Sequence, residues 1–194
     1  MSYEKIKSDM RMAAQRAYDI KLQSGDGGNL SVRVPDQDML LIKASGCSFG
    51  EMNDENIVLI DFDGQIVLGD KIPSREYMTH VAIYKERGEV LAIFHSHSPW
   101  CTSVAEKFDT IPPISLPLEM KIGKVPVLDM GDNHADQEVA DSVRQFLRTN
   151  RDITCFIQKR HGLFSFGSNI IKAEHNAELM EEGSQVGFLA SMKI

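Results

Sequence analysis

The sequence lacks the features that mark several classes of protein. Its only three cysteines are Cys47, Cys101 and Cys155, which lie far apart without a CxxC pair. This odd, scattered set excludes a disulfide framework and a cysteine zinc site, and it predicts reduced, half-buried packing residues. No apolar run approaches the ~20 residues that span a bilayer, and the N-terminal stretch lacks the apolar block of a signal peptide. We therefore expect a cytoplasmic protein with no membrane partner.

Positive charge is also scarce. There are 21 Lys and Arg residues against 28 Asp and Glu, a net charge of −7. This balance disfavours a nucleic-acid partner, so any anionic ligand has to be held locally. Hydrophobic residues make up 42% of the chain and charged residues 25%, which excludes disordered and coiled-coil classes. The length, with no repeat or long linker, predicts a single domain over residues 1–194.

Hydrophobic periodicity predicts an α/β fold in which helices cover a central sheet. Helical spacing predicts helices over residues 3–23, 75–87, 135–147 and 169–190, and a short helix from residue 99. Ser74 is expected to cap the second of these helices. Short β-rich runs between residues 29 and 63 predict antiparallel hairpins. Apolar runs predict further strands at 90–94, 125–128 and 153–157.

Histidine is the informative metal-capable residue. His95 and His97 follow a predicted buried strand, and alternation along a strand places both imidazoles on one face. His161 follows a second predicted buried strand. Three imidazoles suit Zn²⁺, the first expectation, and also Mn, Fe or Co. The alternative, a surface tip at His95–His97 and a hydrogen-bonded loop residue at His161, fits the HxH pattern equally well.

The other three histidines lack a partner at motif spacing. We interpret them as structural or solvated residues: His80, His134 and His175.

Five short motifs occur in order along the chain. They are Gly27-Gly28-Asn29-Leu30-Ser31, Lys43-Ala44-Ser45-Gly46, Pro73-Ser74-Arg75-Glu76, His95-Ser96-His97 and Arg160-His161-Gly162. Together they resemble the class II aldolase family, which includes fuculose phosphate aldolase, ribulose phosphate epimerase, methylthioribulose phosphate dehydratase and the adducin head. The resemblance covers nearly the whole chain. It implies a three-layer α/β/α fold around a mainly antiparallel sheet, usually assembled as a homotetramer with active sites at subunit interfaces.

The resemblance also implies roles for individual residues. His95, His97 and His161 would hold a divalent metal, normally zinc, and Glu76 would be both a further ligand and the acid/base catalyst. A second set would bind the phosphate of a small phosphorylated sugar: Gly28, Asn29, Ser45, Gly46, Ser74 and Arg75. Glycine turns and a helix N-terminus offer N–H donors without a basic surface, although each glycine turn taken alone is more often a plain structural turn.

The activity that the resemblance implies is retro-aldol cleavage of a ketose phosphate of the fuculose or ribulose 1-phosphate type. The metal would stabilise the enediolate formed on bond cleavage, and Glu76 would move the proton. Family epimerases carry an aspartate at the position of Glu76, so epimerisation is less expected. A non-catalytic, adducin-like assembly module is also less expected, because all three metal histidines are present.

One departure from the aldolase pattern leaves a second reaction open. Fuculose phosphate aldolases use a tyrosine after the HxH segment as a proton donor, whereas the last tyrosine here is Tyr84. Glu119 lies in that region, next to Met120, and the dehydratases carry a catalytic glutamate in a similar context. Glu119 is therefore a second catalytic candidate, or else an exposed or salt-bridged residue. Dehydration of methylthioribulose 1-phosphate is the alternative reaction.

Overall fold

The computed structural model describes residues 2–131 and 135–192. Within these residues one sheet of nine strands has the order β4-β3-β2-β1-β5-β9-β8-β7-β6. The strands are β1 (Asn29–Arg33), β2 (Met39–Lys43), β3 (Ile57–Asp61), β4 (Ile66–Leu68), β5 (Ala92–Ser96), β6 (Thr110–Ile111), β7 (Val125–Leu128), β8 (Cys155–Gln158) and β9 (Gly162–Gly167). Each neighbouring pair is antiparallel except β7 and β8, which are parallel.

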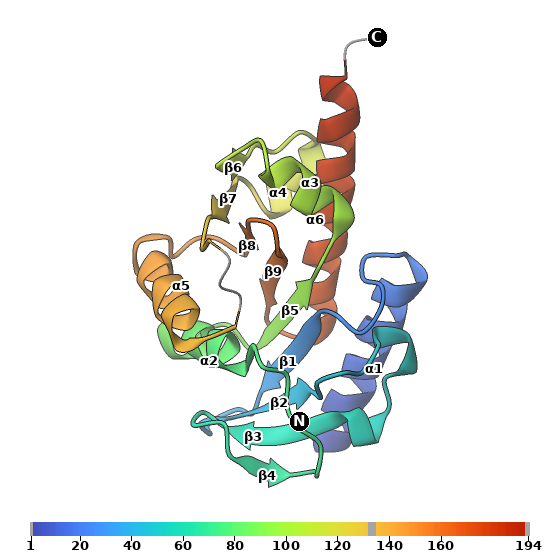
Figure 1. Ribbon diagram of the computed structural model, residues 1–194, viewed down its shortest axis with the longest axis vertical. Coiled ribbons are helices and arrows are strands. Elements are labelled where there is room, and N and C mark those ends of the chain that lie inside the picture. The colour runs from blue at the N-terminus through green and yellow to red at the C-terminus, as the bar shows by residue number, and fades with distance from the viewer. Residues whose placement is uncertain (1, 132–134, 193–194) are drawn as a thin grey trace.

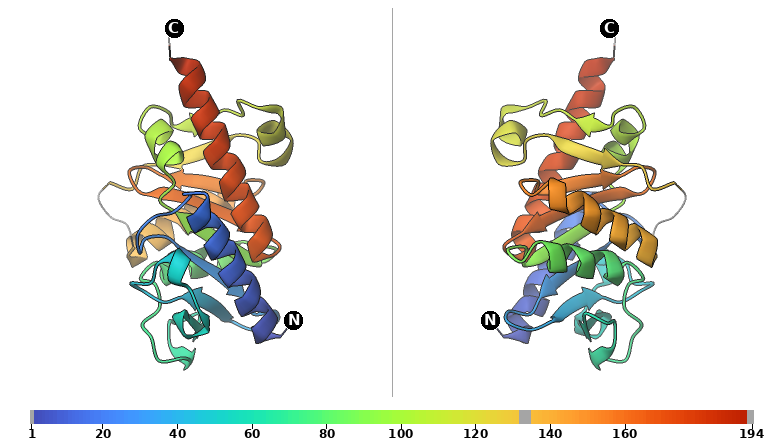
Figure 2. Two further views of the ribbon diagram at one scale, coloured as in Figure 1. Left: turned by 90° about the vertical axis from the view of Figure 1, so that its right-hand side faces the viewer. Right: turned by 90° about the vertical axis from the view of Figure 1, so that its left-hand side faces the viewer.

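Helices cover both faces of this sheet (Figures 1 and 2). They are α1 (Tyr3–Asp19), α2 (Tyr77–Glu86), α3 (Pro99–Ala105), α4 (Leu116–Lys121), α5 (Gln137–Thr149) and α6 (Ile170–Ser191), with short 3-10 helices η1 (Phe49–Glu51) and η2 (Asp54–Asn56). The predicted α/β/α fold with a mainly antiparallel sheet is confirmed.

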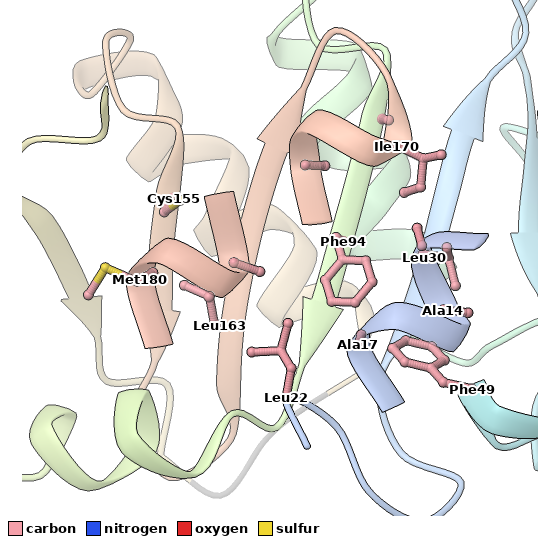
Figure 3. Close-up of a cluster of buried hydrophobic side chains, with 14 of the residues drawn as sticks. Ala14, Ala17, Leu22, Leu30, Phe49, Phe94, Cys155, Leu163, Ile170 and Met180 are labelled. Carbon is pink, nitrogen blue, oxygen red and sulfur yellow. The ribbon is translucent and has the colours of Figure 1, made fainter. Parts of the chain in front are cut away.

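Two hydrophobic cores separate these layers. Helices α1, α3, α4 and α6 share one core with Phe94 and Leu163 of the sheet (Figure 3). Helices α2 and α5 share the other core with Ile93 and Phe164. Adjacent strand residues fall into different cores because side chains alternate between the faces of a sheet. His95 is two residues after Ile93 in the same strand, so its side chain lies on the same face of the sheet, the face covered by α2.

Helix α1 ends earlier than the sequence predicts. The expected end at Gln23 is wrong, because the chain leaves the helix after Asp19. Lys21 adopts a left-handed conformation with φ of 62°. The Leu22 N–H donates to the carbonyl of Ala17 and the Lys21 N–H to that of Tyr18, the two bonds of a Schellman motif. The usual glycine signal for this motif is absent here, so the sequence pattern did not reveal it.

The beginning of α2 and the bounds of β5 also differ from expectation. Ser74 does not cap α2, because its hydroxyl accepts from the Glu76 N–H in a turn that precedes the helix. Glu76 therefore occupies the N-cap position instead of the first helical turn. Strand β5 lies two residues later than predicted, because its pairing with β9 extends to Ser96 opposite Leu163. His95 is consequently a strand residue.

Some elements gave no recognised sequence signal. Strands β4, β6 and β9 and helix α4 were not predicted. Strand β9 begins and ends with glycine, which obscured its apolar centre. The ends of α5, α6 and β8 differ from the predicted ends by one or two residues.

The three cysteines are unpaired, as predicted, but they are buried and not half-buried. Across residues 2–131 and 135–192, no helix combines the length and apolar character needed to cross a membrane.

A buried carboxylate lies where α1 packs on α6. Glu174 has no exposed surface, and neither of its carboxylate oxygens has a hydrogen-bond partner among the described residues. Arg16 Nε lies 3.6 Å from Oε1 and His175 Nε2 lies 3.7 Å from Oε2. Burial raises the pKa of Glu174 to about 7; the charge of Glu178 acts in the same direction, and Arg16 opposes it. The folded protein therefore holds a proton here that the unfolded chain loses at lower pH.

This proton predicts a pH-dependent stability. Between about pH 4.5 and 7 the folded state binds more protons than the unfolded state, so the free energy of unfolding falls as pH rises. Glu174→Gln removes the charge, and should flatten this part of the profile and stabilise the protein at about pH 8 by roughly 1–3 kcal/mol. Thermal unfolding at about pH 5 and about pH 8 measures both effects. Glu182→Gln, an exposed change on the same helix, is the control; an unaltered profile in Glu174→Gln contradicts the prediction.

Candidate metal centre and anion-binding cavity

Three imidazoles converge at one end of the central strands. His95 belongs to β5, which lies between β1 and β9 (Figure 1). His97 is the first residue after β5, and His161 lies in the turn between β8 and β9. One candidate ligand atom from each ring lies within 4.8 Å of the others, and the ring centroids are 4.7 to 5.1 Å apart. The three side chains could therefore bind a single metal ion.

Glu76 faces two of these imidazoles. Its side chain is nearly buried, and Oε2 accepts a hydrogen bond from the Asn29 side-chain amide. Oε2 lies 3.2 Å from His95 Nε2, and Oε1 lies 3.3 Å from His161 Nε2. Asn29 is directly opposite His95 in the β1–β5 pairing, which explains how the amide reaches the carboxylate. The carboxylate is thus held beside the imidazoles by a residue of the sheet.

The hydrogen bonds of His95 test whether a cation fits this site. His95 Nδ1 lies 3.0 Å from the Leu163 carbonyl, which can only accept, so Nδ1 carries the proton. Burial is the main cause that lowers the pKa of His95 well below 6.5, and the nearby His97 and His80 act in the same direction. The neutral ring then directs the Nε2 lone pair at Glu76 Oε2. Two acceptors at this distance require a proton or a cation between them, so the site fits a metal ion.

A cavity of about 300 Å³ opens in front of this centre. His97, His161 and Glu76 lie on its wall, whereas His95 does not line it and is buried behind Glu76. The residues expected to bind phosphate all line the same cavity: Gly28, Asn29, Ser45, Gly46, Ser74 and Arg75. The structure therefore brings the candidate metal ligands and the candidate phosphate-binding residues to one space.

The donors available in this cavity differ from the expected backbone set. The Ser45 N–H donates to the Ile72 carbonyl and the Ser74 N–H to the Lys43 carbonyl. Their hydroxyls, and not these N–H groups, are the donors that the two serines can offer to an anion. The Asn29 side-chain amide donates to Glu76, which lies beside the imidazoles, so this N–H group is engaged near the candidate metal ligands.

Lys43 is a cavity residue to which sequence reasoning assigned no role. Its side chain is 2% exposed, and its ammonium donates to the carbonyls of Asp26 at 3.2 Å, Ala44 at 3.4 Å and Cys47. Burial lowers its pKa, and the carboxylates of Asp26 and Glu76 oppose this shift. The ammonium joins the turn at Asp26 to the turn after β2. The sequence signal that could have identified Lys43 is its position as a lysine at the end of the apolar run of β2.

Glu119 is not brought to this cavity. It is an exposed residue of α4 and does not line the space in front of the histidines. Of the remaining histidines, His80 is buried and lies 2.7 Å from the Ser31 hydroxyl, and His175 is exposed on α6. His134 lies outside the described residues.

The fold and the convergent site define the protein family. The family model for the Class II Aldolase and Adducin N-terminal domain matches residues 8–187. The chain belongs to this family.

Individual relatives are similar over most of their length. L-fuculose phosphate aldolase of Methanococcus maripaludis is 28% identical over 172 residues, which cover 89% of this chain and 90% of the relative. The 3-oxo-tetronate 4-phosphate decarboxylase of Haemophilus influenzae is 30% identical over 181 residues, which cover 90% and 80%. Among solved structures, YgbL of Escherichia coli has a TM-score of 0.88 at 26% identity, covering 98% of this chain and 91% of that one.

Two glycines with the same backbone conformation provide a matched test of the cavity wall. Gly25 and Gly28 both have φ of 64°. A Cβ on Gly28 would lie 2.7 Å from Gln23 Oε1 and 2.8 Å from the His95 carbonyl oxygen, whereas a Cβ on Gly25 would meet nothing within 4 Å. Alanine at either position would thus suffer the same backbone strain, but only at Gly28 would the added Cβ also collide with neighbouring atoms.

We expect Gly25→Ala to destabilise the protein by about 1–2 kcal/mol through strain alone. Gly28→Ala should cost at least about 1 kcal/mol more, because overpacking adds to the strain, and should weaken binding of inorganic phosphate. Urea unfolding and phosphate titration measure the two effects. Equal behaviour of the two variants would show that the Gly28 contact is unimportant.

Proposed function

We propose that the protein is a metal-dependent lyase that cleaves a carbon–carbon bond of a small phosphorylated ketose by retro-aldol chemistry. The observation that carries this proposal is the convergence of three imidazoles and the Glu76 carboxylate on the cavity that also contains the candidate phosphate-binding turns. Zinc is the proposed ion, and Mn, Fe and Co are alternatives that suit the same ligands. The similarity to an L-fuculose phosphate aldolase supports the proposed substrate class.

Each group would have a defined part in this reaction. A divalent ion at His95, His97 and His161 would polarise the substrate carbonyl and stabilise the enediolate charge. The hydroxyls of Ser45 and Ser74, together with Arg75, would hold the phosphate locally, which explains how a chain with a net charge of −7 retains an anion. Glu76 lies between the two groups of residues and would deliver the proton that completes the released fragment.

Decarboxylation of a phosphorylated 3-oxo sugar acid is a second candidate. When 3-oxo-tetronate 4-phosphate loses CO₂, the electron pair of the broken carbon–carbon bond stays on the carbon next to the carbonyl. The resulting anion is the enediolate of dihydroxyacetone phosphate. Retro-aldol cleavage of fuculose 1-phosphate leaves the same fragment but also requires removal of a hydroxyl proton. The last tyrosine, Tyr84, precedes His97, so the tyrosine donor of the fuculose phosphate aldolases has no counterpart after the HxH segment. This difference and the similarity to a decarboxylase are the observations that support decarboxylation as the second candidate beside the proposed retro-aldol cleavage.

An assembled state is part of the proposal. Helix α4 exposes Leu116 at 67% and Met120 at 77%, and the end of α6 exposes Leu189 at 52%. Burial of such side chains against another subunit would be favourable, which supports self-association of the chain; a homotetramer is the assembly that we propose. Glu119 lies between Leu116 and Met120, so a catalytic contribution from Glu119 would be made from this surface.

Product analysis distinguishes the candidate reactions. We expect the zinc-loaded protein to form dihydroxyacetone phosphate, detected through coupled oxidation of NADH, and to lose this activity when a chelator removes the metal. Release of an aldehyde from fuculose 1-phosphate identifies the aldolase, and release of CO₂ from 3-oxo-tetronate 4-phosphate identifies the decarboxylase. Loss of water alone from methylthioribulose 1-phosphate identifies the dehydratase and overturns the proposed cleavage. Absence of any product at full zinc occupancy also overturns it.

The role of Glu76 is tested by a conservative substitution. Glu76→Gln should lower kcat by about 100-fold or more, the usual loss when a general acid or base is removed. Glu119→Gln, on an exposed site outside the cavity, should change kcat by less than about twofold. Zinc content is measured in both variants to separate proton transfer from metal loss. If Glu119→Gln causes the larger loss, the acid/base role belongs to Glu119.

A further inference from the structure

Gln23 is a buried amide behind the wall of the cavity. It follows α1, and its side chain is 3% exposed. Oε1 accepts a hydrogen bond of 2.6 Å from the His97 N–H, and Nε2 donates at 2.6 Å to the Ser24 carbonyl. The amide oxygen of Gln23 thus binds a candidate metal ligand, and the amide nitrogen binds the next residue of its own loop.

His97 lies just beyond the end of the sheet strand β5. The β1 pairing of β5 extends to Asn29 opposite His95, and the β9 pairing extends to Ser96 opposite Leu163. His97 is exposed and is the first residue after β5. Gln23 Oε1 accepts from the His97 N–H just beyond the paired part of the strand, and this bond holds the His97 backbone in place.

The same amide contacts the glycine turn at the cavity. A Cβ on Gly27 would lie 2.7 Å from His97 Nδ1 and 3.0 Å from Gln23 Nε2, and a Cβ on Gly28 would lie 2.7 Å from Gln23 Oε1. The turn therefore packs directly on the amide and on the His97 ring. Gln23 therefore contacts both the candidate anion-binding turn, through this packing, and the candidate metal ligand, through the His97 N–H.

We propose that Gln23 is a positioning residue that fixes His97 as a metal ligand and sets the spacing between the metal centre and the turn at Gly27 and Gly28. This inference rests on the proposed function, because it requires a metal ion at the three imidazoles. Gln23 itself does not line the cavity and so does not touch the substrate there. Its effect is exerted through the backbone of His97 and the glycine turn.

Gln23→Leu removes the acceptor while nearly preserving side-chain volume. We expect the zinc affinity of the folded variant, measured by competition with a chelator, to fall about 10- to 100-fold, as when a supporting partner of a metal ligand is lost. Hydrogen exchange at the His97 amide should become faster in the metal-free protein, because its acceptor is gone. This second measurement detects the hydrogen bond between Gln23 and the His97 N–H directly, and it requires neither bound metal nor enzymatic activity.

A matched control separates positioning from general stability. Asn176 on α6 donates its side-chain amide to the Phe166 carbonyl at 2.9 Å and does not line the cavity. Asn176→Leu removes a side-chain amide bond to a backbone carbonyl, as Gln23→Leu does at Ser24, but no bond to a candidate metal ligand, and it should leave zinc affinity within about twofold of wild type. If Gln23→Leu does not fold, Gln23→Met, with its unbranched side chain, replaces it in both measurements.

The outcomes distinguish this inference from the proposed function. Zinc binding by wild type, together with unchanged zinc affinity and unchanged His97 exchange in a folded Gln23 variant, overturns the positioning role alone. A wild-type protein that binds no zinc overturns the proposed function and this inference with it. Weaker zinc binding with faster exchange in the Gln23 variant, and neither in Asn176→Leu, supports the role.

Discussion

The position of β5 between β1 and β9 is the constraint on which the rest of the site depends. One pairing places Asn29 opposite His95, so its amide reaches Glu76. The other brings the Leu163 carbonyl to His95 Nδ1, which fixes the proton on that nitrogen and turns Nε2 toward the carboxylate. Because sheet hydrogen bonds determine both contacts, the site has little freedom to rearrange when a ligand enters.

The centre also concentrates polar groups where water is excluded. His95 has no exposed surface and Glu76 is 7% exposed, so their mutual approach costs free energy unless a cation or a proton lies between them. This cost is the physical reason that the arrangement suits a metal ion. On the wall of the same cavity, serine hydroxyls and Arg75 provide local donors, and the acidic surface of the whole chain has little influence on a ligand held this closely.

Much of the fold and of the candidate site could be predicted because the relevant signals are local. The apolar runs that became β5 and β8, and the histidines that follow them, were visible in the sequence. The end of α1 was missed because Lys21 takes the left-handed position that glycine usually occupies. The N-cap position of Glu76 was missed because the turn formed by Ser74 resembles a capping pattern. The exact end of a helix is poorly predicted from sequence, because the local preferences of neighbouring residues are similar and tertiary contacts determine which residue ends the helix.

The sequence by itself determined which groups are present: three histidines at strand ends, a glutamate before a helix, glycine turns and an acidic surface. Only the tertiary structure decided their use. It joined Gln23 to His97, directed the Asn29 amide to Glu76 and left Glu119 on an exposed helix. The physical reason is that side-chain periodicity acts over a few residues, whereas these contacts join segments that only the order of strands in the sheet brings together.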